Sequence, residues 1–388
     1  MKLAERMGVL GTETAFEVLA KARRLEAEGK DVIHLEIGEP DFATPENVVQ
    51  AGVNALNSGD THYGPSPGFP AVRDRIAAEV SATRSISVTG DNVIITPGGK
   101  PIMFFTMLAL VDPGDEVLYP NPGFPIYESM IRFTGGVPVP MKLHESLDFN
   151  IDIEEVASQI THKTKLMVVN SPNNPCGSVV SEQDLKALAE LAVKHDLIVL
   201  SDEIYIRFLY EGDHKSITAF PGMRERTIIL DGFSKTYAMT GWRAGYGVMP
   251  LELVEPISRL VTNSVSCTAS FTQAAMLEAL EGPQGSSYDM VSEFKARRDV
   301  IVNGLNEIPG IRCAMPQGAF YAFPNVEDTG MSSQEFANLV LEEVGVACLS
   351  GESFGKFGKG FVRFSFANST KNIEEALERI DRFVKSRI

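Results

Sequence analysis

The stretch TIILDGFSKTYAMTGWRAGYG, residues 227–247, is the most informative part of this chain. It runs from an apolar strand into a turn of small residues that ends at Lys235. A lysine among apolar neighbours is withdrawn from water, which favours its neutral amine, the form that attacks carbonyls to make a Schiff base. Eight residues on, Arg243 offers a permanent fork of donors that suits a phosphate. This pattern indicates pyridoxal 5′-phosphate (PLP) chemistry, with a solvated loop lysine as the alternative.

The composition indicates a globular protein of two domains, because 388 residues is long for one core and the hydrophobic fraction is 44%. The formal net charge is −16, from 35 basic and 51 acidic residues. An acidic chain disfavours nucleic acid and anionic membrane surfaces as partners. It does not exclude an anionic substrate, since local Arg and Lys can dominate a cleft.

The cysteines lie far apart in the sequence and form no Cys-x-x-Cys motif, which indicates reduced thiols in a cytosolic protein. The start of the chain, MKLAERMGVLGTETAF, has no apolar run long enough for a secretory signal. No stretch approaches the roughly 18 apolar residues of a membrane span. We therefore expect a cytoplasmic protein without a membrane partner. The cysteines are Cys176, Cys267, Cys313 and Cys348.

Apolar strands alternate with amphipathic helices through the middle of the chain. Runs such as LMVVN (166–170) and LIVLS (197–201) are almost continuously apolar, as is typical of strands buried on both faces. Between them, Ser181 and Asp184 form a candidate capping box that precedes apolar residues at helical spacing. The pattern predicts an α/β fold with a largely parallel sheet. The other expected strands are 93–96, 116–119, 227–231 and 244–249.

Near residue 290 the rhythm changes to long helices with the short strands QGAFYAF and FVRFSFA, which predicts a second, α+β domain. At the other end, a helical pattern over residues 12–29 ends at a glycine. We expect three parts: residues 1–30 as an N-terminal segment that packs with the small domain, 31–285 as the large PLP-binding domain, and 286–388 as the small C-terminal domain.

Two strand ends carry groups suited to a cofactor. Gly98, Gly99 and Lys100 follow an expected strand and open a helix, where backbone N–H groups can bind an anion. Asp202 closes another strand, at the sheet edge where ligands of open α/β sheets bind. A carboxylate there can keep a pyridine nitrogen protonated. The alternative for the glycine segment is an ordinary turn. The alternative for Asp202 is a helix N-cap or a metal ligand.

Arg363 alternates with phenylalanines in the apolar strand FVRFSFA, which is unusual for a surface charge. A guanidinium binds a carboxylate through two parallel hydrogen bonds and so fixes its orientation. The pattern indicates a carboxylate anchor.

Other catalytic motifs are excluded. GPSPG (64–68) fits the G-x-S-x-G pattern of hydrolases, but its two prolines place the serine in a loop rather than on a strand-to-helix elbow. The chain contains no dinucleotide G-x-G-x-x-G, no phosphate-binding G-x-x-x-x-G-K-[ST] and no zinc-binding H-E-x-x-H. We expect no metal site.

The motifs follow one another along more than 300 residues: IGEPDF, YGPSPGFPAVR, TPGGKP, NPGFPIY, NSPNNPCG, SDEIY, SKTYAMTGWRAGY and VRFSFA. This ordered set resembles the class I/II aminotransferases, the aspartate aminotransferase family of fold-type I PLP enzymes. The resemblance implies a large domain with a mostly parallel seven-stranded sheet flanked by helices, and a smaller α+β domain. It also implies transfer of the amino group of an α-amino acid to a 2-oxo acid by a ping-pong mechanism, with aspartate and glutamate as candidate donors.

The resemblance implies that Lys235 holds PLP and moves the substrate proton. It implies that Tyr63 reaches the phosphate bound in the neighbouring subunit, so that a homodimer shares its active sites. Asn174 and Tyr205 would contact the phenolic oxygen of the ring. The other implied cofactor-binding residues are Gly99, Lys100, Phe124, Asp202, Ser234 and Arg243.

For the substrate, the resemblance implies that Arg363 and the backbone of Gly38 bind the α-carboxylate, with Asn174 nearby. Lys100 matches a lysine that meets the distal carboxylate of aspartate in some bacterial relatives, and a solvated lysine is the equal alternative. The sequence departs from the family pattern at three positions. Phe124 stands where many members have Trp or Tyr, Gly232 where many have Ser, and Cys176 where Thr is usual. Ser234 is a candidate substitute for the missing phosphate-binding serine.

Two rival functions share parts of this pattern. A PLP-dependent lyase or cyclase would use the same cofactor pocket, and the sequence separates it poorly from a transaminase. A PLP-sensing regulator would need a DNA-binding extension, for which residues 1–30 are too few.

Overall fold

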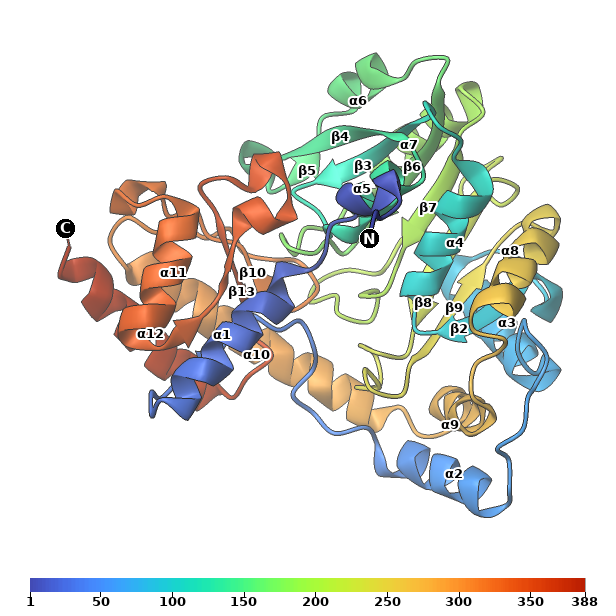
Figure 1. The fold of residues 1–388 in the computed structure, drawn as a ribbon, viewed down its shortest axis with the longest axis horizontal. Helices are drawn as coiled ribbons and strands as arrows, with labels where there is room; N and C mark the ends of the chain where they lie inside the picture. The colour runs from blue at the N-terminus through green and yellow to red at the C-terminus, as the bar shows by residue number, and fades with distance from the viewer. Residues whose placement is uncertain (388) are drawn as a thin grey trace.

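An eight-stranded mixed sheet forms the centre of the larger part of the protein (Figure 1). The computed structural model describes residues 1–387. The strand order is β2-β9-β8-β7-β6-β3-β4-β5. The strands are β2 Val93–Pro97, β3 Glu116–Asn121, β4 Val137–His144, β5 Asn150–Ile151, β6 Thr164–Asn170, β7 Ile198–Asp202, β8 Thr227–Gly232 and β9 Ala244–Val248.

Five neighbouring strands, β4, β3, β6, β7 and β8, run parallel, whereas β9 is antiparallel to both β8 and β2. The α/β prediction with a mostly parallel sheet is confirmed. The expected number of seven strands is wrong by one, because β5 returns antiparallel onto β4. This strand has only two residues, too few to carry a recognisable apolar alternation.

Helices cover both faces of the sheet because successive side chains of each strand point to opposite faces. In β6, Leu166 and Val168 pack in the cluster that contains α4, α5 and α8, whereas Met167 and Val169 pack with α6 and α7. Helices α3 and α9 cover β2 and β8. The helices are α2 Glu46–Asn57, α3 Pro70–Arg84, α4 Lys100–Leu110, α5 Ile126–Phe133, α6 Ile153–Gln159, α7 Glu182–Lys194, α8 Leu251–Ser264 and α9 Ser270–Glu281.

The smaller part gathers the two ends of the chain, and Figure 1 shows the blue α1 against the orange and red C-terminal elements. Its short strands form the antiparallel sheet β10-β13-β12 and the parallel pair β1-β11. Its elements are α1 Thr14–Ala27, β1 Ile33–His34, α10 Gly285–Glu307, β10 Tyr321–Ala322, α11 Ser333–Val344, β11 Val346–Ala347, β12 Leu349–Ser350, β13 Val362–Ser365 and α12 Thr370–Lys385.

The division into domains stays a prediction, but the elements give it a physical basis. Helix α10 begins at Gly285, next to the expected boundary. Strand β1 pairs with β11, so the chain stays with the C-terminal elements for several residues beyond 30. Ile33 and Leu35 lie in the same apolar cluster as α10 and α12. No helix within residues 1–387 is both long and apolar enough to cross a membrane.

Candidate active site

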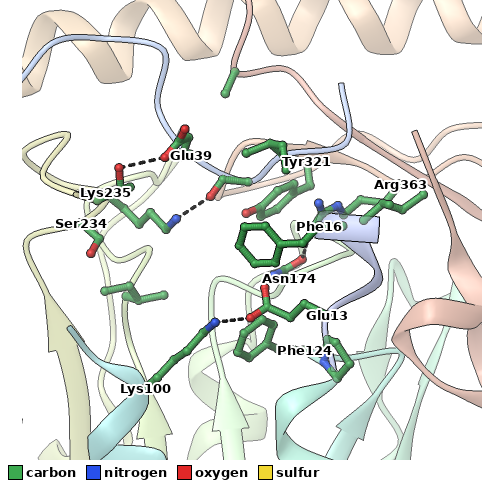
Figure 2. Close-up of a pocket in the computed structure, with 18 of the residues that line it drawn as sticks. Glu13, Phe16, Glu39, Lys100, Phe124, Asn174, Ser234, Lys235, Tyr321 and Arg363 are labelled. Carbon is green, nitrogen blue, oxygen red and sulfur yellow. Dashed lines mark hydrogen bonds and ion pairs between the residues drawn. The ribbon is translucent and has the colours of Figure 1, made fainter. Parts of the chain in front are cut away.

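A cavity of about 830 Å³ lies between the carboxyl ends of the parallel strands and the smaller part. Of the twelve residues predicted for the site, only Tyr63 is absent from its wall. Figure 2 shows six of the others, which come from several elements and point into a common space: Lys100, Phe124, Asn174, Ser234, Lys235 and Arg363. The predicted residues in the wall are Gly38, Gly99, Lys100, Phe124, Asn174, Asp202, Tyr205, Ser234, Lys235, Arg243 and Arg363.

Lys235 follows β8 in the turn that enters the cavity, and its Nζ donates a hydrogen bond to the carbonyl oxygen of Gly38 (Figure 2). Withdrawal from water lowers the pKa of Lys235 to about 8, although the carboxylates of Glu39 and Glu13 act in the opposite direction. A substantial fraction of the amine is therefore neutral near pH 8, as a nucleophile and proton acceptor requires.

Asp202 ends β7 and is buried at the floor of the cavity. Tyr127, on α5, donates a hydrogen bond from its hydroxyl to Asp202 Oδ2 at 2.6 Å, and the backbone N–H of Ile204 reaches Oδ1 at 3.3 Å. Burial raises the pKa of Asp202 to about 6, while both hydrogen bonds oppose that rise. A protonated ring nitrogen would stabilise the anion further. Tyr127 closes the motif NPGFPIY, but the sequence alone predicts no role for it.

Arg363 on β13 is only 4% exposed. Its Nη1 donates to Asn174 Oδ1 at 3.0 Å and its Nη2 to the carbonyl oxygen of Glu36, while Nε is buried without a partner. The guanidinium lies 4.5 Å from the ring centroid of Tyr321 and 4.9 Å from that of Phe354. Within residues 1–387 no carboxylate forms an ion pair with it. A buried guanidinium without an anion is costly, so this site favours an anionic ligand.

The turn before α4 and the side chain of Arg243 form a cradle for a second anion. Gly98 has φ +82°, and a Cβ there would lie 2.1 Å from Arg243 Nη2. Only glycine therefore allows the guanidinium to approach this backbone. Arg243 donates to the carbonyl of Thr240 at 2.7 Å and is exposed. Gly99 caps α4, whose first N–H groups lack helical partners.

Two hydroxyl groups meet in the upper wall of the cavity. Tyr205 and Tyr321 lie with their oxygens 2.7 Å apart. Gly38 must be glycine here, because a Cβ would come within 2.3 Å of the Tyr321 hydroxyl. The ring of Phe124 lines the cavity and packs edge-on against Tyr127, with centroids 5.7 Å apart. The sequence places Tyr321 in a short strand and predicts no role for it.

Lys100 is the first residue of α4 and forms an ion pair with Glu13, at the N-terminal edge of the cavity (Figure 2). The Lys100 side chain is 49% exposed. Glu13, the N-cap residue of α1, and Phe16, on its first turn, also line the cavity. The sequence predicted only that this segment packs with the small domain, and no motif there indicates a part in the site.

Tyr63 lies in the loop between α2 and α3 and is 89% exposed. It is not among the cavity-lining residues of its own subunit. Its predicted contact with a cofactor phosphate therefore needs a second subunit.

A buried ionic network lies on the strands behind Asp202. Arg84 Nε donates to Glu203 Oε2 at 2.9 Å, and its Nη2 contacts Asp231. Tyr246 donates to the same Asp231 carboxylate at 2.9 Å. Because side chains alternate along a strand, Glu203 and Asp231 project away from the face that carries Asp202. The network fixes the ends of β7 and β8, and no pattern in the sequence predicts it.

The groups in the cavity fit PLP. Lys235 supplies an amine, Asp202 a buried carboxylate, and the Gly98–Gly99 turn with Arg243 a cradle for a phosphate. Arg363 adds a buried cation for the carboxylate of a substrate.

Comparison with known proteins agrees with this geometry. The family described as aminotransferase class I and II matches residues 30–380. The aspartate aminotransferase of Geobacillus stearothermophilus is 37% identical over 394 residues, which cover 100% of each chain. Among solved structures, the aspartate aminotransferase from Thermus thermophilus with maleate is 38% identical, with a TM-score of 0.94 over 98% of this chain and 99% of that one.

A third relative is named for a different substrate. The alanine aminotransferase from Pyrococcus furiosus is 35% identical, with a TM-score of 0.95 over 100% of both chains. Overall similarity therefore does not distinguish between amino donors. The chain belongs to the class I and II aminotransferase family and is a PLP-dependent transaminase.

Proposed function

We propose that this transaminase takes aspartate or glutamate as its amino donor and a 2-oxo acid as acceptor. The observation that carries the proposal is the presence of two cationic anchors, Arg363 and Lys100, in the wall of one cavity. Arg363 suits the α-carboxylate that every donor has, and Lys100 suits a second carboxylate. The names of the Geobacillus and Thermus relatives support the same donor.

Lys235 would hold PLP, Asp202 would pair with its ring nitrogen, and Gly99, Ser234 and Arg243 would hold its phosphate. When bound, PLP makes the Cα–H bond of an amino acid acidic by drawing its electrons into the ring. The amine of Lys235 would take the proton from Cα and return it to a carbon two atoms away, on the far side of the amino nitrogen. A pKa of about 8 suits an amine that must both accept and donate a proton near neutral pH.

Arg363 orients the substrate for this transfer. A fork of two N–H groups on the α-carboxylate fixes the Cα–H bond relative to Lys235, which lowers the entropy cost of the reaction. Asn174 accepts a hydrogen bond from Nη1 and so holds the guanidinium plane. The aromatic rings of Tyr321 and Phe354 exclude water from the guanidinium.

The test is a half-reaction screen, in which the absorbance of bound PLP converts to that of pyridoxamine phosphate as each amino donor is added. We expect aspartate or glutamate to react fastest among aspartate, glutamate, alanine, phenylalanine and lysine. Lys100→Ala should lower kcat/KM for the dicarboxylates about tenfold, since its side chain is half-exposed, and leave alanine unchanged. Lys163→Ala, an exposed lysine away from the cavity, is the matched control. Equal losses for alanine and aspartate would place Lys100 at the cofactor or the fold instead.

We further propose that the enzyme is a homodimer with shared active sites and that it is cytoplasmic. The phosphate cradle is exposed at Arg243, and Tyr63 projects from the surface of its own subunit. Exposed apolar side chains on α2, Val49, Val53 and Leu56, offer an apolar surface for the partner. The cytoplasmic location rests on the composition and the separated cysteines.

Complementation between subunits tests the dimer. In a mixture of Tyr63→Ala and Lys235→Ala subunits, each hybrid dimer has one site with both native residues. We expect the mixture to recover up to about a quarter of wild-type activity, since half of the dimers are hybrids with one native site each. The same two variants, combined as preformed dimers under conditions that prevent subunit exchange, should recover nothing. A fully active monomer in sedimentation would contradict the proposal.

A further inference from the structure

The N-cap residue of α1, Glu13, does not use its side chain to cap its own helix. Its carboxylate instead crosses to α4 and forms an ion pair with Lys100 Nζ (Figure 2). The Glu13 side chain is 19% exposed, so it lies largely inside the cavity wall. The contact joins positions 87 residues apart and links the N-terminal segment to the large sheet part.

The Glu13 carboxylate lies in the same cavity as the cationic side chains that would bind the proposed substrate. Lys100, Lys235 and Arg363 all line the same cavity as Glu13. The negative charge of Glu13 acts in the direction that raises the pKa of Lys235, which burial lowers overall. The carboxylate of Glu13 therefore lies in the part of the cavity where an acidic substrate would place its second carboxylate.

We propose that Glu13 is a specificity-determining residue, because its carboxylate occupies the partner position on Lys100 that the distal carboxylate of an acidic substrate requires. The proposal rests on the proposed donor class and refines it. Glu13 competes with dicarboxylates, which must displace it or share Lys100 with it. Glu13 does not compete with a donor that has a neutral side chain.

The competition follows from charge and exposure. Two carboxylates on one ammonium repel each other, and the partly buried position of Glu13 reduces the solvent screening of that repulsion. Lys100 is half-exposed, so the pair is weak enough to be exchanged. A neutral donor leaves the Glu13–Lys100 pair intact beside Phe16, which lines the same edge of the cavity.

The test compares two unreactive four-carbon acids that bind the holoenzyme, succinate with two carboxylates and butyrate with one. Their dissociation constants are measured from the change in PLP absorbance. Glu13→Gln keeps the shape of the side chain and should tighten succinate about three- to tenfold, with butyrate unchanged. Glu17→Gln, an exposed acid one turn further along α1, is the control for net charge and should change neither.

A double variant identifies the partner. Lys100→Met should weaken succinate, and adding Glu13→Gln to it should have no further effect, because the competition needs the ammonium. If Glu13→Gln tightens both acids equally, its charge acts on Arg363 and the proposal is overturned. If it weakens succinate, Glu13 positions Lys100 rather than competing for it, and the proposal is equally overturned.

The outcomes separate this inference from the proposed donor class. If the wild-type enzyme prefers succinate to butyrate and the Glu13→Gln variant shows the same dissociation constants, only the role of Glu13 is ruled out. A wild-type enzyme that reacts with neither aspartate nor glutamate in the half-reaction screen sinks the donor class itself. Glu13→Ala repeats the measurement without an amide that could still hydrogen-bond Lys100.

Discussion

The hydroxyl of Tyr127 donates a hydrogen bond to Asp202 Oδ2 at 2.6 Å, and both residues are buried. Burial raises the pKa of the tyrosine well above its ordinary value, so that it remains a donor over the whole working pH range. The same bond opposes the rise that burial imposes on the pKa of Asp202. Tyr127 therefore stabilises the carboxylate anion that a protonated cofactor ring needs as its partner.

We predict that Tyr127→Phe raises the pKa of Asp202 above about 6 and weakens PLP binding most strongly at low pH. A hydrogen bond to a charged group contributes about 1.5–3 kcal/mol, so the affinity should fall roughly tenfold or more below neutral pH. The measurement is the dissociation constant of PLP between pH 5 and 8. Tyr119→Phe is the control, because Tyr119 donates to Glu128 at 2.6 Å outside the cavity wall. An unchanged pH profile in Tyr127→Phe would assign the residue to packing alone.

We predict that Lys235→Ala abolishes turnover, since no other amine among the described cavity residues is held at the end of β8. The variant should still bind PLP through the phosphate cradle and Asp202. Equilibrium dialysis of PLP and single-turnover assays with an amino donor separate the two effects. Activity near that of the wild type would rule out the assignment.

The parallel strands β3, β6, β7 and β8 could be predicted from the sequence within two residues, whereas the longest parallel strand, β4, was missed, because its half-exposed sequence VPVPMKLH carries two prolines and no continuous apolar run. β6 and β7 are buried on both faces, so their apolar runs are continuous, and turn residues mark their ends. The pairs β1-β11 and β4-β5 could not be predicted. Strands β1, β11 and β5 have two residues each and exist because a partner strand lies beside them. Such a strand leaves no periodic pattern in its own sequence.

The site shows the same division. Lys235, Asp202 and Arg363 follow or lie in strands whose pattern and motif are local, and the sequence pointed to each of them. Tyr127 acquires its role from Asp202, 75 residues away, and Arg84 from Asp231, 147 residues away. Local propensity cannot predict such contacts, because they depend on how the strands are ordered in the sheet.

Arg84 holds two buried carboxylates, Glu203 and Asp231, and we predict that its loss is strongly destabilising. Arg84→Met would leave Asp231 without its cation and Glu203 with only His214, 3.2 Å away, and breaking a buried pair costs about 3–5 kcal/mol. The midpoint of thermal unfolding should fall accordingly. Arg73→Met, whose ion pair with Asp91 at 3.7 Å is on an exposed carboxylate, should change stability far less.

Neutralising Glu203 and Asp231 tests whether uncompensated charge causes the loss of stability. Arg84→Met combined with Glu203→Gln and Asp231→Asn removes the uncompensated charges, so we expect it to recover most of the lost stability. If the triple variant is less stable than Arg84→Met alone, the arginine acts by filling space rather than by neutralising charge. Urea unfolding of the three proteins gives the comparison.

His34 makes stability depend on pH in the alkaline range. Its Nδ1 lies 2.8 Å from Glu36 Oε1 and its Nε2 3.2 Å from Glu26 Oε1. The hydrogen bond with Glu36 raises the pKa of His34 to about 9, against the opposing effect of burial. Because the folded-state pKa lies above the ordinary 6.5, the stabilisation is complete below pH 6.5 and is lost as the pH rises through about 9.

We therefore predict that His34→Gln is less stable than the wild type at pH 6 and that the difference disappears by about pH 9.5. The difference at pH 6 should be about 1 kcal/mol, reduced by solvent screening because the ring is 30% exposed. The measurement is the thermal midpoint of both proteins at half-unit steps of pH. His162→Gln, at an exposed position, is the control and should show no such trend. A difference that stays constant from pH 6 to 9.5 would show that His34 stabilises the fold by packing and not by its charge.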